Sequence, residues 1–258
     1  MALSQLSRSI RGSAVLVTGA ASGIGRATAF VFADEGARLV ISDRNAEELE
    51  KVRTAIAEAG GDVVALTADL ADRDAVTGLV ETAVSELGGL DVLVNNAGLA
   101  ILAGVDGDNY SDSWDISMAV MAQAQAWAAR AALPALRQSA NPRIINLAST
   151  EALGATAYNS AYVAAKHASL GLTRALAVEL GKEGITVNAI CPGPVRTGIT
   201  DAIPEDDKQT FARRRTALRR YAEPEEIAHG ILHLALPASS FITGAALVVD
   251  GGLTIRNA

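Results

Sequence analysis

Residues 14–25 read AVLVTGAASGIG, in which an unbroken apolar run leads straight into three closely spaced glycines. A short apolar run of this kind is typical of a strand that is buried on both faces of a parallel sheet. Helical periodicity follows from Ile24 to Gly36, so the glycines lie in the turn between a strand and a helix. Glycines there allow a tight turn and let the backbone approach a pyrophosphate closely. The stretch predicts a dinucleotide-binding turn, with an ordinary strand–helix turn as the alternative, and its expected cofactor contacts are Gly19, Ser22, Gly23, Ile24 and Gly25.

The same alternation of short apolar runs and longer amphipathic runs continues to the end of the chain. Strands are expected at 38–42, 63–66, 90–94, 143–147, 186–190 and 246–249, and helices at 46–59, 72–87, 112–136, 160–180 and 224–236. Strands that alternate with helices form a parallel sheet covered by helices on both faces. We therefore predict an α/β fold, a doubly wound Rossmann-type sheet of about seven strands, as a single domain over residues 1–258. A polar, proline-containing segment at about 193–222 interrupts the alternation and is expected to form a substrate lid.

The charge and cysteine content exclude several classes of function. The 258 residues carry 22 basic and 29 acidic side chains, for a net charge of -7, which argues against nucleic-acid binding. No apolar run reaches the roughly 18 residues of a membrane span, and the N-terminus lacks a secretory signal pattern. Cys191 is the single cysteine and cannot form an internal disulfide, which suits a reducing compartment. We expect a soluble, cytoplasmic protein that binds neither nucleic acid nor a membrane.

Asp43, at the end of the second expected strand, bears on the choice of nucleotide. A carboxylate in this position accepts hydrogen bonds from both ribose hydroxyls and repels a 2′-phosphate. This favours NAD over NADP. The neighbouring Arg44 leaves NADP open as the alternative, because an arginine beside the ribose can pair with a 2′-phosphate.

Tyr162 and Lys166 are four positions apart in the helix expected at 160–180, and so lie on one face of it. A tyrosine titrates near pH 10 and needs a nearby cation before it can exchange protons at neutral pH. Lys166 can supply that charge. Ser149 follows the strand expected at 143–147, where its hydroxyl can bind a substrate oxygen. The alternative is a surface tyrosine packed on a lysine stem, with a serine that only satisfies its own loop.

Together these segments resemble a known family. Thr18-Gly-x-x-x-Gly-Ile-Gly25, Asn95-Asn-Ala-Gly98, Ser149, Tyr162-x-x-x-Lys166 and Cys191-Pro-Gly193 resemble the short-chain dehydrogenase/reductase family over nearly the whole chain. The resemblance implies that Tyr162 is the general acid/base and that Ser149 holds the reacting oxygen. It also implies that Lys166 lowers the pKa of the tyrosine and binds the nicotinamide ribose. Further cofactor contacts implied by it are Asp69, Leu70, Asn96, Ala97, Gly98, Pro192, Gly193, Val195 and Thr197, and the implied assembly is a homotetramer paired through the helices at 119–132 and 161–180.

Met121 departs from the family pattern. The family usually has an asparagine at this place, which anchors a water that passes protons between the lysine and solvent. A thioether donates no hydrogen bond and accepts poorly. Two interpretations follow: an active enzyme that uses another polar group, with Gln125 as the candidate, or a non-catalytic NAD-binding regulatory protein.

The substrate itself is only loosely indicated. The expected substrate contacts are Ser149, Glu151, Tyr158 and Tyr162, with residues 99–105 as an apolar wall. The run from Arg213 to Arg215 is expected to be a solvated surface, and the alternative is a site for a carboxylate or a phosphorylated carrier. No metal site is expected.

We therefore expect an oxidoreductase of the short-chain alcohol dehydrogenase/ketone reductase type. It would transfer a hydride between NAD(H) and a secondary alcohol or ketone. An NADPH-dependent 3-oxoacyl thioester reductase is the alternative within enzymes, motivated by Arg44 and the arginine run.

Overall fold

The computed structural model describes residues 5–256. Over that range the chain forms one seven-stranded sheet in the order β3-β2-β1-β4-β5-β6-β7, and every neighbouring pair of strands is parallel. The strands are β1 (Ala14–Thr18), β2 (Arg38–Asp43), β3 (Asp62–Thr67), β4 (Val92–Asn95), β5 (Arg143–Leu147), β6 (Thr186–Pro192) and β7 (Ala246–Val249). This confirms the predicted doubly wound sheet.

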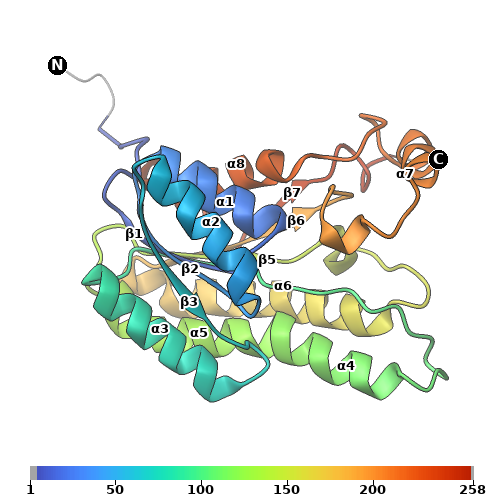
Figure 1. The fold of residues 1–258 in the computed structure, drawn as a ribbon, viewed down its shortest axis with the longest axis horizontal. Coiled ribbons are helices and arrows are strands. Elements are labelled where there is room, and N and C mark those ends of the chain that lie inside the picture. The colour runs from blue at the N-terminus through green and yellow to red at the C-terminus, as the bar shows by residue number, and fades with distance from the viewer. Residues whose placement is uncertain (1–4, 257–258) are drawn as a thin grey trace.

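Helices cover both faces of the sheet. They are α1 (Gly23–Asp34), α2 (Ala46–Glu58), α3 (Arg73–Leu87), α4 (Tyr110–Met118), α5 (Ala124–Leu136), α6 (Ser160–Leu180), α7 (Glu205–Arg215) and α8 (Pro224–Ala235). In Figure 1, α1, α2 and α8 lie on one side of the sheet, and α3, α4, α5 and α6 lie on the other. The helix α7 stands apart from both layers, beyond the end of the sheet.

The alternation of side chains along each strand explains the two large hydrophobic cores, one on each face of the sheet. Successive side chains of a strand point to opposite faces. Val15 and Val17 therefore pack with α1, α2 and α8, whereas Leu16 packs with α3, α5 and α6. Because both faces are buried, the strand reads as an unbroken apolar run in the sequence.

Local sequence signals set several helix ends. Asn45 accepts a hydrogen bond from the backbone N–H of Glu48 at 3.2 Å, which caps α2. Pro224 occupies the first turn of α8, where a missing N–H does no harm, and a capping box joins Glu223 to Glu226. Among the described residues, no helix is both long and apolar enough to cross a bilayer.

Two elements differ from the sequence prediction. The helix expected at 112–136 is interrupted by a π-helical turn, Ala119–Gln123, between α4 and α5. Such turns are frequent at functional sites, and this one contains Met121. The lid segment holds α7, which was not predicted because its sequence EDDKQTFARRR buries only Lys208 and Ala212 and has no apolar stripe.

The strand order fixes where a ligand can bind. β1 and β4 are neighbours, yet the chain runs outward from β1 to β3 on one side and from β4 to β7 on the other. The loops that follow β1 and β4 therefore diverge and open a crevice at the carboxyl ends of the strands.

Candidate active site

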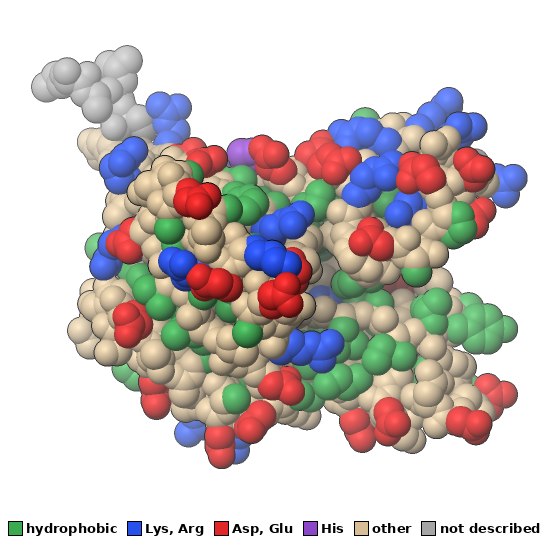
Figure 2. All heavy atoms as spheres, in the orientation of Figure 1, with side chains coloured by type: hydrophobic (Ala, Val, Ile, Leu, Met, Phe, Trp, Pro, Cys, Tyr) green, Lys and Arg blue, Asp and Glu red, His purple; other side chains and the backbone are tan. Residues whose placement is uncertain are grey.

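A cavity of about 650 Å³ lies at the carboxyl ends of the strands. In Figure 2 the surface is hollowed beside the part formed by α7, and hydrophobic side chains border the hollow. The strand order divides the cavity into two ends. The first is built by residues up to position 100, which follow β1 to β4, and includes Asp43 and Asp69. The second is built after position 146, from the ends of β5 and β6, α6, the segment up to Tyr221 and Leu253, and Val120 of the π-helical turn lines the cavity as well.

Most of the sequence-predicted residues meet here. Among the predicted cofactor contacts, those that line the cavity are Gly19, Ser22, Gly23, Ile24, Asp43, Arg44, Asp69, Leu70, Asn96, Ala97, Gly98, Tyr162, Lys166, Pro192, Gly193, Val195 and Thr197. Ser149 and Glu151 line it as well, whereas Gly25 and Tyr158 do not.

The glycine turn has the shape that a pyrophosphate needs. Gly19 and Gly23 have φ angles of 66° and 53°, which favour glycine. A Cβ at Gly25 would lie 2.0 Å from the carbonyl oxygen of Gly19, so this glycine permits close packing rather than ligand contact. The first turn of α1 faces the cavity, and the hydroxyl of its N-cap residue Ser22 makes no capping bond. The side chain of the N-cap residue pairs with none of the backbone N–H groups of this turn. A helix N-terminus with N–H groups left in this way fits an anionic group.

Asn96 holds the glycine turn after β1 close to the end of β4. Its side-chain amide donates to the carbonyl oxygens of Thr18 at 2.8 Å and Gly19 at 3.0 Å. The backbone of Ala97 and Gly98 is thereby held along the cavity wall.

Asp43 ends β2 beside this turn. Its carboxylate accepts from the backbone N–H of Ala21 at 3.1 Å and of Asn45 at 3.0 Å. These bonds fix the carboxylate at the cavity edge, next to the exposed side chain of Arg44.

Ser149, Tyr162 and Lys166 converge at the second end. The Nζ atom of Lys166 lies 5.5 Å from the centre of the Tyr162 ring and donates to the carbonyl oxygen of Leu147 at 2.6 Å. Burial lowers the pKa of Lys166 to about 8. Burial also raises the pKa of Tyr162, a hydrogen bond with Ser149 lowers it, and the Glu151 carboxylate raises it further.

The expected lowering of the tyrosine pKa by Lys166 is therefore not found in the protein alone. Burial outweighs the hydrogen bond from Ser149, and the pKa of Tyr162 lies above its ordinary value. One N–H of the Lys166 ammonium group goes to the carbonyl oxygen of Leu147, and burial destabilises the charged form of the lysine.

Met121 is fully buried in the π-helical turn. A side chain added at Gly98 would meet both the Met121 sulfur and Lys166 Nζ, so the thioether lies in the neighbourhood of the lysine. Gln125 does not line the cavity, and its Oε1 accepts from the Ser169 hydroxyl at 2.7 Å. It is thus not placed to relay protons from the cavity.

The predicted substrate wall is only partly present. Leu99 and Ala100 line the cavity, but Ile101, Leu102 and Val105 are exposed. Tyr158 lies outside the cavity with 75% of its surface exposed, and its carbonyl oxygen instead accepts from the N–H of Ala103.

The segment at about 193–222, expected to be a substrate lid, brings a second apolar surface to the cavity, whose individual residues the sequence analysis did not name. This surface comes from the lid and the C-terminal segment and consists of Ile199, Ile203, Phe211, Tyr221 and Leu253. The isolated aromatic Phe211 in an otherwise polar stretch was the signal available for it.

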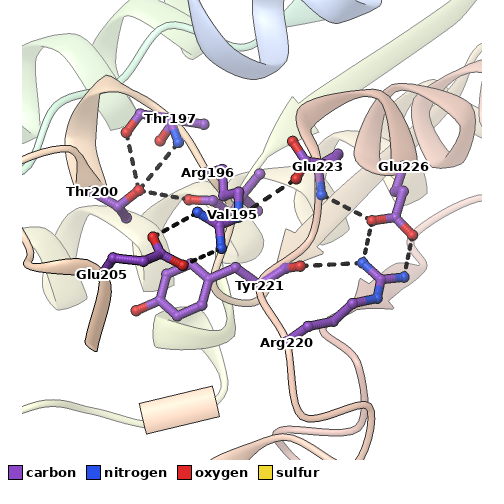
Figure 3. A network of polar contacts seen from close by, with 9 residues as sticks. All are labelled: Val195, Arg196, Thr197, Thr200, Glu205, Arg220, Tyr221, Glu223 and Glu226. Atoms are coloured by element: carbon purple, nitrogen blue, oxygen red, sulfur yellow. Dashed lines mark hydrogen bonds and ion pairs between the residues drawn. The ribbon is translucent and has the colours of Figure 1, made fainter. Parts of the chain in front are cut away.

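Ion pairs hold the base of the lid (Figure 3). Arg196 contacts Glu205 of α7 at 2.6 Å and Glu223, before α8, at 3.5 Å. The Thr200 hydroxyl donates to the carbonyl oxygens of Val195 and Thr197. The run from Arg213 to Arg215 lies outside the cavity lining and is exposed, as the solvated-surface interpretation predicted.

Comparison with known proteins places this geometry in a family. A crystal structure of a short-chain type dehydrogenase/reductase from Mycobacterium marinum superimposes with a TM-score of 0.89 at 32% identity, covering 96% of this chain and 98% of that one. The family model described as enoyl-(acyl carrier protein) reductase matches residues 19–254. The chain belongs to the short-chain dehydrogenase/reductase family.

Other relatives and a further solved structure extend the comparison. (2S)-[(R)-hydroxy(phenyl)methyl]succinyl-CoA dehydrogenase subunit BbsD of Thauera aromatica is 37% identical over 95% of this chain and 98% of its own length. Meso-2,3-butanediol dehydrogenase of Serratia marcescens is 37% identical over 93% of this chain and 94% of its own. A short-chain dehydrogenase from Burkholderia cenocepacia J2315, solved in complex with NADP, has a TM-score of 0.88 at 33% identity, covering 95% of this chain and 99% of that one. The protein is thus an NAD(P)-binding oxidoreductase that acts on a small molecule.

Proposed function

We propose that this short-chain dehydrogenase/reductase interconverts a secondary alcohol and its ketone with NAD(H) as cofactor. The observation that carries the proposal is the meeting of Ser149, Tyr162 and Lys166 at the wall of one cavity, with Ser149 close enough to the phenol to lower its pKa. Serratia marcescens meso-2,3-butanediol dehydrogenase, a relative of similar length, acts on an alcohol by its name.

Each of the three side chains has a distinct task in this proposal. In the oxidative direction the Tyr162 phenolate oxygen takes the proton of the substrate hydroxyl. Ser149 donates a hydrogen bond to the same substrate oxygen and steadies the charge that develops on it. Lys166 has three donors, of which one goes to Leu147, and the others are proposed to hold the ribose. Bound NAD(P)+ supplies the hydride acceptor.

The preference for NAD over NADP is proposed from Asp43. Its carboxylate is fixed at the first end of the cavity by two backbone N–H groups. A 2′-phosphate there would meet a negative charge that cannot swing away. Arg44 beside it supports the NADP alternative, so the two cofactors are compared in the test below.

The first test measures cofactor binding and turnover on the same samples. Nicotinamide fluorescence during titration with NADH and NADPH gives the two dissociation constants, and a panel of secondary alcohols and ketones follows. We expect tighter binding of NADH. Tyr162→Phe is expected to keep NADH binding while losing at least about a hundredfold in kcat, the usual contribution of a general acid/base.

Tyr110→Phe is the matched control, since the Tyr110 hydroxyl only accepts a bond from Ser160 outside the cavity. It should leave kcat unchanged. Tighter binding of NADPH with turnover of a 3-oxoacyl thioester would favour the reductase alternative. Binding without turnover of any panel member would favour a regulatory protein and give weight to Met121 as a lost relay.

A further inference from the structure

The lid brings apolar side chains to the cavity and leaves them partly open to solvent. Ile199, Ile203 and Phe211 line the cavity, and Phe211 keeps 40% of its surface exposed. The two isoleucines are exposed as well. A single exposed apolar side chain is ordinary on a protein surface, but several around one cavity are typical of a site for an apolar ligand. We call these three residues the lid cluster.

Phe211 lines the cavity and contributes little to the core of the fold. It is the one large apolar residue of α7, and the positions that this helix buries are Lys208 and Ala212. Its ring meets the ring of Tyr221 in an edge-on arrangement, with the two ring centres 6.1 Å apart. Tyr221 is buried, so it gives the Phe211 ring a fixed support at the cavity.

Apolar residues also form the wall that comes from the loop after β4. Leu99 and Ala100 line the cavity, and Val120 of the π-helical turn lines it too. Ile101 and Leu102 follow directly in the chain and are exposed, Leu102 with 68% of its surface. Figure 2 shows hydrophobic side chains along the border of the hollow. The apolar surface therefore continues from the cavity toward solvent and can contact a ligand that extends out of it.

The charges of the second end of the cavity disfavour an anionic ligand. The cavity lining holds the cations Arg44 and Lys166 and no further Lys, Arg or His from the described residues. Arg44 belongs to the first end, and Lys166 is buried and donates to Leu147. Asp207 of α7 and Glu151 add two carboxylates to the lining. A carboxylate or phosphate beside the lid cluster would meet like charges and no free cation, whereas an uncharged apolar group would meet neither penalty.

We propose that the substrate is a secondary alcohol or ketone with a large, uncharged apolar group, a ring or an alkyl chain. That group packs against the lid cluster while the reacting carbon lies at Tyr162. Phe211 is then a residue that determines specificity. This inference rests on the proposed alcohol–ketone activity of the same site.

The test compares four secondary alcohols that share one methyl carbinol. They are 2-butanol, 2-octanol, 1-phenylethanol, and 7-hydroxyoctanoate, in which a carboxylate replaces the far methyl group of 2-octanol. Each CH₂ group buried in an apolar site favours binding about fourfold. We therefore expect kcat/KM for 2-octanol to exceed the values for 2-butanol and for 7-hydroxyoctanoate at least about tenfold. Either order of 2-octanol and 1-phenylethanol above 2-butanol supports the proposal, and the order identifies the group as a chain or a ring.

Phe211→Ala removes the ring from the lid cluster. The ratio of kcat/KM for 2-octanol to that for 2-butanol should fall about five- to tenfold, mainly through a higher KM for 2-octanol. Phe211→Leu keeps an apolar side chain and should retain most of the ratio. Phe241→Ala, at a fully exposed phenylalanine outside the cavity lining, is the control and should leave all four values unchanged. If Phe211→Ala does not fold, Ile203→Thr is expected to lower the same ratio.

Equal losses for all four alcohols in Phe211→Ala would show that Phe211 only supports the lid, and would overturn the proposal. So would a wild-type preference for 2-butanol or for 7-hydroxyoctanoate. If no alcohol is turned over, the proposed activity has failed, and calorimetric binding of the same compounds to the wild-type protein with NAD+ in excess decides the inference. Tighter binding of 2-octanol or 1-phenylethanol than of 2-butanol, lost in Phe211→Ala, would support it. Binding of none of them, or binding without this preference, would overturn it.

Discussion

Lys166 carries a charge where water has little access. Its side chain is 4% exposed, and burial lowers its pKa from 10.5 to about 8. Between these two pH values the unfolded chain holds a proton that the folded chain has released, so stability rises with pH across that window. Below about pH 8 both states hold the proton, and the full penalty of burying the charge remains.

Lys166→Met should therefore stabilise the fold while removing activity. At pH 7 we expect the free energy of unfolding to increase by about 1–3 kcal/mol, less than the pKa shift alone implies because the bond to Leu147 is lost. The gain should shrink as the pH approaches 10. Urea unfolding at a series of pH values measures it. Lys182→Met, at an exposed lysine, is the control, and a destabilised Lys166→Met at pH 7 would contradict the argument.

At the residue scale, the sequence predicted where the site residues lie better than it predicted their pKa values. The spacing of Tyr162 and Lys166 and the strand end before Ser149 place all three at one cavity, because helix and strand geometry is regular. The raised pKa of Tyr162 depends on burial, which spacing does not encode. Tyr158 was misplaced because its φ of 60° and its bond to Ala103 arise from contact between two loops.

At the scale of elements, the lid base is held by a few exposed ion pairs. Arg196 joins α7 to the segment before α8 through Glu205 and Glu223. The pKa of Glu205 is lowered to about 2, chiefly by its hydrogen bond with Arg196, so the pair stays charged at any pH above that value. Exposed pairs of this kind are weak and are screened by salt.

Arg196→Gln should loosen the lid without unfolding the protein. We expect KM for the alcohol to rise about two- to fivefold with little change in melting temperature, in line with the strength of exposed ion pairs. The wild-type KM should rise with salt, and that of the variant should respond less. Arg137→Gln breaks a similarly exposed pair with Glu183 away from the cavity and is the matched control. An unchanged KM in Arg196→Gln would refute the lid role proposed for about 193–222.

Elements with strong periodicity were predicted nearly to their ends. The strand expected at 143–147 and the helix expected at 160–180 agree with β5 and α6. The π-helical turn at Ala119–Gln123 was not predicted, because the alanine-rich sequence around it is compatible with an unbroken α-helix. Helix α7 has almost no buried face, so the apolar pattern on which helix prediction relies is missing.

At the scale of the whole molecule, an outward stripe of α6 remains uncovered. Gly171, Ala175 and Val178 lie on one face of the helix, and Val178 is 86% exposed. The alanines of α5, by contrast, are largely buried within the subunit. The proposed homotetramer would cover the α6 stripe.

Val178→Arg should therefore lower the assembly state. Light scattering is expected to give four times the 26.5 kDa of one chain for the wild type and a smaller mass for the variant, since a charge would be buried at the contact. Val105→Arg, at another exposed valine, should leave the mass unchanged. A monomeric wild type would exclude the tetramer.

The overall topology was within reach of the sequence because alternation of strands and helices, together with right-handed crossovers, leaves few arrangements. The layers in Figure 1 follow that rule. The rule does not predict how far the lid stands from the sheet. That distance depends on side-chain contacts such as the one between the rings of Phe211 and Tyr221.

Apart from Val120, the lining of the cavity comes from two stretches of the chain, one up to position 100 and the other after position 146. Mutations that arise in the later half can therefore alter which alcohol is accepted while the end that holds Asp43 and Asp69 is inherited intact. A duplicated gene would have to explore only part of its length to acquire a new substrate. The order of the strands thus lets the substrate range change through few mutations.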